Sequence, residues 1–257
     1  MPSDPTSSSS LLIFIAEILL FALGAVVVAL YAYGAIWAFR IRGALMTPLY
    51  RERALWVGVV GVFFTTLIAS NLLIRLLDPT NFYLSLFQYC IVDAAGIVTL
   101  AWIDTTIKLA RRLDPLNRNT FKWKQLRIVI WVLTFLTTGG SLAEVIILRI
   151  NFFTSPSGAG GAFIAGSFGW VLLGFIALLL SYRRSKDPVL KEHLKWFGLF
   201  LLLLFIVDTI LSKQIPPFRI LGEILLALDA YFLYRGARSL APFSRVPLEQ
   251  NALTSSR

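Results

Sequence analysis

The sequence predicts an all-α membrane protein, a bundle of seven transmembrane helices with its N-terminus outside and its C-terminus in the cytoplasm. Of its 257 residues 57% are hydrophobic, and the mean hydropathy is +0.75. One soluble core cannot bury that much apolar surface, whereas helices exposed to lipid can. Two further observations support the prediction: the apolar residues come in long blocks, and basic loops alternate with loops that carry few charges.

Each apolar block is long enough to cross a membrane, which takes about 20 residues for roughly 30 Å of hydrocarbon. The seven blocks are 11–39, 54–77, 84–108, 127–150, 160–182, 193–212 and 217–235. The first block follows the segment MPSDPTSSSS, which has no basic side chain, and it is too long for the apolar core of a signal peptide. We therefore expect an uncleaved first helix.

The predicted domain organisation is a single transmembrane domain over 11–241. We expect a disordered external tail over 1–10 and a disordered cytoplasmic tail over 242–257, because both are short and rich in Ser and Pro. The prolines lie in tails, loops or helix borders and in no helix interior. Glycine pairs inside the blocks are expected to allow close helix packing. These pairs include Gly58 with Gly61 and Gly139 with Gly140.

Basic residues set the predicted orientation. Of the 24 Lys and Arg side chains, 20 lie in the tail after the last block or in every second loop. Only four lie on the opposite side: Arg75, Arg149, Lys213 and Arg219. An excess of positive charge marks cytoplasmic loops, which places the C-terminus inside. It also explains the basic pI without nucleic acid, which we do not expect as a partner.

The candidate functional residues are carboxylates inside the blocks, because ionisable groups at membrane depth are costly and usually face a cavity or a partner. With a rise of 1.5 Å per residue, four fall at similar depth in the outer half. These candidate ligand- or ion-binding residues are Asp93, Glu144, Asp208 and Glu223. Asp104 and Asp229 lie nearer the inner side and form a candidate relay. The alternative is that each carboxylate is neutral or paired and only ties helices together.

The chain resembles microbial rhodopsins in size and topology, and Asp93 and Asp104 resemble the proton acceptor and donor of a light-driven pump. Retinal, however, needs a lysine in the last helix, and the block FRILGEILLALDAYFLYRG has none. Haem held by two histidines is excluded within one chain, because His193 is the only histidine. We expect no cofactor, no metal and no enzymatic activity. His193 is expected to face solvent or headgroups, and Cys90 to be a small buried residue.

A second resemblance is local. The stretch KDPVLKEHLKWFGLFLLLL resembles the beginning of a late helix in seven-helix sensor modules of prokaryotic membrane kinases. This resemblance implies a sensor-like or receptor-like protein, which we expect in the plasma membrane. From the carboxylates we expect an outer acidic pocket that binds a small ligand, cation or proton, and from the basic inner loops a contact with a cytoplasmic or membrane partner. The alternatives left open are a proton- or cation-coupled transporter and a scaffold subunit of a larger membrane complex.

Overall fold

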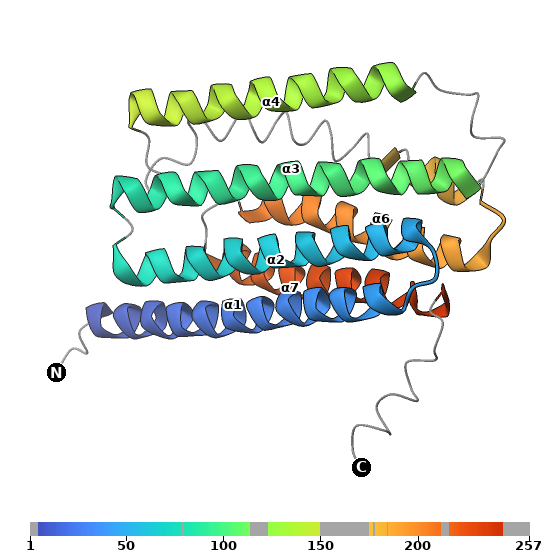
Figure 1. Ribbon diagram of the computed structural model, residues 1–257. Helices are drawn as coiled ribbons and strands as arrows, with labels where there is room; N and C mark the ends of the chain where they lie inside the picture. Colours follow the sequence, from blue (N-terminus) through green and yellow to red (C-terminus); the bar gives the residue numbers. More distant parts are fainter. Residues whose placement is uncertain are drawn as a thin grey trace, which may run out of the picture.

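The described part of the chain is almost entirely helical, and its long helices lie side by side with roughly aligned axes (Figure 1). The computed structural model describes residues 5–78, 80–113, 123–149, 175–176, 178–183, 185–211 and 216–243. The helices are α1 (Pro5–Ala44), α2 (Pro48–Leu77), α3 (Phe82–Leu113), α4 (Trp123–Leu148), α6 (Pro188–Leu211) and α7 (Pro216–Arg238), followed by the short 3-10 helix η2 (Ala241–Phe243). No strand occurs within these ranges.

Within the described residues, four helical segments are long and apolar enough to cross a membrane, which makes the chain an integral membrane protein. They are Phe14–Ala44, Pro48–Leu77, Phe82–Thr106 and Trp131–Leu148. Large apolar side chains are exposed along these helices, as a surface in contact with lipid tails requires. The fifth predicted block, 160–182, lies mostly outside the described residues. The count of seven spans and their orientation therefore stay predictions.

Several helices begin earlier than their apolar blocks because polar residues cap them. Thr47 accepts a hydrogen bond from the Tyr50 amide at 3.4 Å, and Pro48 occupies the first turn of α2. Asn81 accepts from the Tyr83 amide before α3, and Asp187 accepts from the Val189 amide before α6, both at 2.9 Å. These caps satisfy amides that have no partner within the helix.

The helices α1, α2, α3, α6 and α7 enclose one hydrophobic core, and α4 packs on the outer side of α3 (Figure 1). α1 approaches α2 closely at two glycines, where an added Cβ would lie 2.8 Å from the Phe39 ring at Gly58 and 2.9 Å from the Ala35 Cβ at Gly61. The predicted role of this pair in packing is confirmed. Gly139 and Gly140 on α4 have no described atom within 4 Å of such a Cβ, so no packing role is seen for them.

The two ends of the bundle are named inner and outer after the orientation that the basic residues predict. The inner end carries the turn between α1 and α2, the beginning of α6 and the end of α7 (Figure 1). η2 folds against this turn, since the Met46 amide donates to the Phe243 carbonyl at 3.1 Å and the Phe243 ring stacks on Tyr50 at 3.9 Å. The outer end carries the turn between α2 and α3.

Candidate functional site

Two of the four predicted outer carboxylates lie near one tyrosine. Asp93 is buried on α3 with 6% of its surface exposed, whereas Glu144 is exposed on α4. Tyr89, one turn before Asp93, lies within electrostatic range of both carboxylates. Tyr89 packs against Val145 of α4, so both carboxylates lie near the contact between α3 and α4.

The third outer carboxylate has different neighbours. Glu223 is half-buried on α7, and Arg75 at the end of α2 lies within electrostatic range of it. Its Oε2 atom is buried and finds no hydrogen-bond partner in the described part of the chain. The side chain of Asp208 lies outside what the structure describes. Convergence of all four carboxylates in one pocket therefore stays a prediction.

The two residues of the predicted inner relay have separate partners. Asp104 on α3 forms an ion pair with Lys108 one turn later, at 3.0 Å. Asp229 on α7 is fully buried and accepts a hydrogen bond of 2.6 Å from the hydroxyl of Tyr31 on α1. Each contact engages one oxygen of its carboxylate, and the second also joins α1 to α7.

A set of five buried aromatic rings crosses the bundle between the outer carboxylates and the inner end. Tyr31 stacks on Phe64 at 5.3 Å, Phe64 meets the edge of Phe200 at 5.9 Å, and Phe200 meets Trp102 at 5.3 Å. Phe197 packs edge to face on Trp102 and completes this aromatic layer. The layer takes rings from α1, α2, α3 and α6, and all five side chains are buried.

Below the layer, at the inner end, Arg53 and His193 form the centre of a buried polar cluster. Arg53 Nε donates to His193 Nε2 at 2.9 Å, and Arg53 Nη1 donates to the Trp102 carbonyl at 2.9 Å and to the Thr105 hydroxyl at 3.3 Å. Arginine has no acceptor atom, so Nε2 of His193 accepts and carries no proton. We call this cluster, completed by Gly236 and Ser239, the inner junction.

The other imidazole nitrogen connects the inner junction to α7. Nδ1 of His193 lies 2.9 Å from the Gly236 carbonyl and 2.9 Å from the Ser239 hydroxyl. Ser239 in turn donates to the Gly236 carbonyl at 2.6 Å. The proton of a neutral His193 is therefore on Nδ1, and one imidazole links α2 to α7 through α6.

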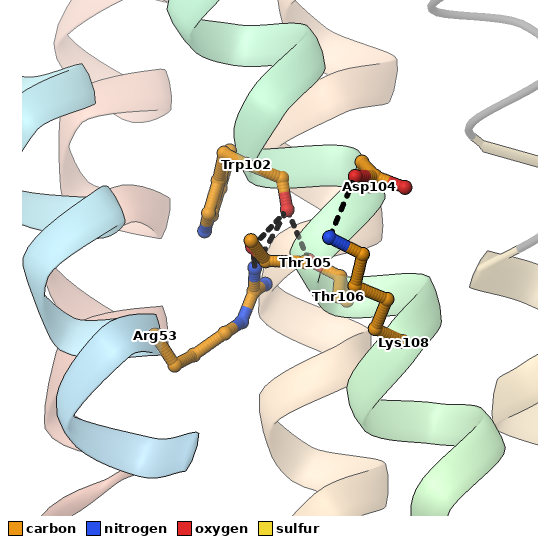
Figure 2. A network of polar contacts seen from close by, with 6 residues as sticks. All are labelled: Arg53, Trp102, Asp104, Thr105, Thr106 and Lys108. Carbon is orange, nitrogen blue, oxygen red and sulfur yellow. Dashed lines mark hydrogen bonds and ion pairs between the residues drawn. The ribbon is translucent and has the colours of Figure 1, made fainter. Parts of the chain in front are cut away.

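Arg53 is a buried cation whose described contacts include no carboxylate. It is 1% exposed, and its guanidinium carbon lies 5.0 Å from the Trp102 ring centroid and 4.5 Å from that of Phe197. Such cation–π contacts lower the cost of burying a guanidinium. Figure 2 shows Arg53 and Trp102 together on one side of α3, while Asp104 and Lys108 lie on its other side.

The inner junction corrects two expectations and contains residues that the sequence prediction missed. His193 was expected to face solvent or headgroups, but it is 1% exposed, because it shares one helical face with Leu190, Leu194 and Phe197. The second apolar block, 54–77, leaves Arg53 outside the predicted helix, but α2 begins at Pro48 and places it more than one turn inside. Cys90 is also corrected, since it is exposed on α3.

Comparison of the chain with known protein families, with characterised proteins and with solved structures finds no match. Its role must therefore be inferred from its own residues. Within the described ranges, no three His, Cys, Asp or Glu side chains gather as metal ligands would.

Proposed function

We propose that this integral membrane protein is a seven-helix receptor or sensor whose outer half receives a small ligand, cation or proton. Its N-terminus would lie outside and its basic inner face would contact a cytoplasmic or membrane partner. This reading agrees with the local resemblance to prokaryotic sensor modules in the segment that starts at Lys186.

The observation that carries the proposal is the aromatic layer. A receptor needs one opening to its ligand, whereas a carrier needs a polar path that reaches both sides of the membrane. Five packed rings between the outer carboxylates and the inner junction favour the receptor, because apolar side chains at native packing density leave little room for water or solute.

α7 supplies a physical connection between input and output. It carries Glu223 in the outer half, Asp229 against the aromatic layer and Gly236 in the inner junction. At 1.5 Å per residue, these positions follow one another at steps of roughly 10 Å along the helix. Binding or protonation at Glu223 would change the electrostatic balance with Arg75, and a small shift of α7 would then alter the contacts of His193.

Cysteine accessibility tests this proposal directly. Cys90→Ser provides a background without thiols, since Cys90 is the only cysteine. In that background, a membrane-impermeant thiol reagent added from outside should label Asp93→Cys and Glu223→Cys but not Thr105→Cys. Labelling of the two outer positions from the inner side as well would contradict a receptor and favour a carrier.

The carrier is the second candidate, and one observation favours it. Asp229 places an ionisable group against the aromatic layer, and its Oδ1 atom is buried without a hydrogen-bond partner among the described residues. A proton carrier needs such a group at mid-depth. Proton flux into proteoliposomes that contain a pH-sensitive dye distinguishes the two candidates. A flux that the unmodified chain shows and Asp229→Asn loses would support a carrier.

A further inference from the structure

The inner junction holds a positive charge that its described neighbours do not neutralise. Within the described part of the chain its only cation is Arg53, because His193 accepts from Arg53 and is neutral, and because Lys108 pairs with Asp104 on the other side of α3 (Figure 2). Neither ion pair found among the described residues, Asp104 with Lys108 and Glu192 with Arg235, involves Arg53. A buried charge without a counter-charge is strongly disfavoured in a membrane protein.

Two buried N–H donors of this cluster also lack an acceptor. Arg53 Nη2 and Trp102 Nε1 find no hydrogen-bond partner in the part of the chain that the structure describes. Both groups can only donate, so no rotation or tautomer can make them satisfy each other. Figure 2 shows the indole and the guanidinium beside each other between α2 and α3. A positive charge and two unused donors at one place are what an anion requires.

We propose that the inner junction binds one small inorganic anion of halide size, chloride in the cell, held by Arg53 Nη2 and Trp102 Nε1. We choose the smallest anions because Arg53 is 1% and Trp102 is 2% exposed, so that their donors are closed off by the packed helices. The anion neutralises Arg53 and thereby strengthens the contact among α2, α3, α6 and α7. This inference does not depend on the receptor role.

Thermal unfolding of the full chain in detergent micelles tests the site. We measure the melting temperature at constant ionic strength while chloride replaces gluconate, an anion too large for the junction. A ligand that binds only the folded state raises this temperature, by about 3 °C or more once chloride exceeds its Kd severalfold, and the rise then continues with the logarithm of the chloride concentration. Bromide should act like chloride, and crystals soaked in bromide should show an anomalous peak beside Arg53 Nη2.

Three variants separate a specific site from a general salt effect. Trp102→Phe keeps an aromatic ring but removes one donor, and should weaken chloride binding roughly tenfold. Arg53→Gln should abolish it. Arg235→Gln is the matched control, because Arg235 also lies over an indole, that of Trp196 at 4.6 Å, but is partly exposed. This control should respond to chloride like the unmodified chain.

Several results would overturn the site. Equal melting temperatures in chloride and gluconate would mean that no halide binds. An unchanged chloride response in Trp102→Phe would show that the effect arises elsewhere. If Arg53→Gln does not fold, the chloride response of Trp102→Phe and the position of the bromide peak still test the site. A bromide peak only at other positions would reject the proposal.

Discussion

Single residues of the inner junction illustrate how much a hydropathy profile hides. Arg53 precedes the second apolar block and therefore looked like part of a basic loop, yet Thr47 and Pro48 form a helix start that places it inside α2. His193 stands in the charged run KEHLK, but the spacing of Leu190, His193, Leu194 and Phe197 is that of one buried helical face. The helix cap before Arg53 and the apolar spacing around His193 could thus have been recognised in the sequence. The partners of the two side chains could not, because they depend on tertiary packing.

Removal of the imidazole should destabilise the inner junction. His193→Ala leaves Arg53 Nε without its acceptor and removes the contact of Nδ1 with the Gly236 carbonyl. The loss should lower the free energy of unfolding by about 1–3 kcal/mol. His193→Gln offers an amide oxygen and should recover part of this loss. Reversible unfolding in mixed micelles measures the effect. Lys195→Ala, an exposed position on the same helix, is the control and should change stability by less than about 0.5 kcal/mol.

A second residue-scale prediction concerns the turn after α2. The hydroxyl and amide of Thr80 donate to Asp78 at 2.6 and 2.9 Å and lower the pKa of that carboxyl. A lowered pKa stabilises the turn above the ordinary pKa of aspartate, and this contribution is lost as the pH falls through the folded value. Thr80→Val should raise the pKa of Asp78 in an NMR titration, whereas Thr80→Ser should keep it low. Equal values in all three chains would contradict the contact.

At the scale of elements, the apolar blocks predicted the helices well because lipid imposes the same requirement of length and hydrophobicity on every span. All six helices of the described chain fall on a predicted block. Helix ends were less well predicted, since caps and proline rather than hydropathy decide them. Membrane depth along each helix follows from the sequence by residue count and stays a prediction. Which carboxylates face one another could not be predicted, because it depends on the rotation of each helix about its own axis.

The contact between α1 and α2 yields the element-scale prediction. Gly61→Ala would place a methyl group 2.9 Å from the Ala35 Cβ and 3.2 Å from Leu233 Cδ2, which should cost about 1–3 kcal/mol through overpacking. Ala35→Gly in the same chain should restore part of the stability. In Gly139→Ala the added methyl group meets no described atom. The free energy of unfolding should stay the same or rise by up to about 1 kcal/mol, because alanine loses less backbone entropy on folding than glycine. A neutral Gly61→Ala would mean that the two helices do not pack this closely.

For the whole molecule, the distribution of basic residues predicts the orientation. With 20 of 24 Lys and Arg side chains on one side, a reporter active only in the cytoplasm should give signal when fused after Arg257. The same reporter placed before Leu11 should remain silent. Signal from the N-terminal fusion alone would reverse the topology, and signal from both would imply an even number of spans.

The last prediction concerns coupling between the two ends of the molecule. If the outer carboxylates receive a proton or cation, a change there must alter helix contacts that extend through α7 to the inner junction, because a ligand shifts a conformational equilibrium only by its differential affinity for the two states. A fluorescent label on Arg238→Cys in the Cys90→Ser background should then respond to a drop in external pH from about 8 to 5, a range in which carboxyl groups in apolar surroundings titrate. Asp93→Asn and Glu223→Gln should abolish this response while the protein stays folded. Glu52→Gln, an exposed carboxyl at the inner end, is the control and should leave it unchanged. If the fluorescence response to pH persists in both Asp93→Asn and Glu223→Gln, these two carboxylates do not sense the proton. Their role would then be only to hold helices together.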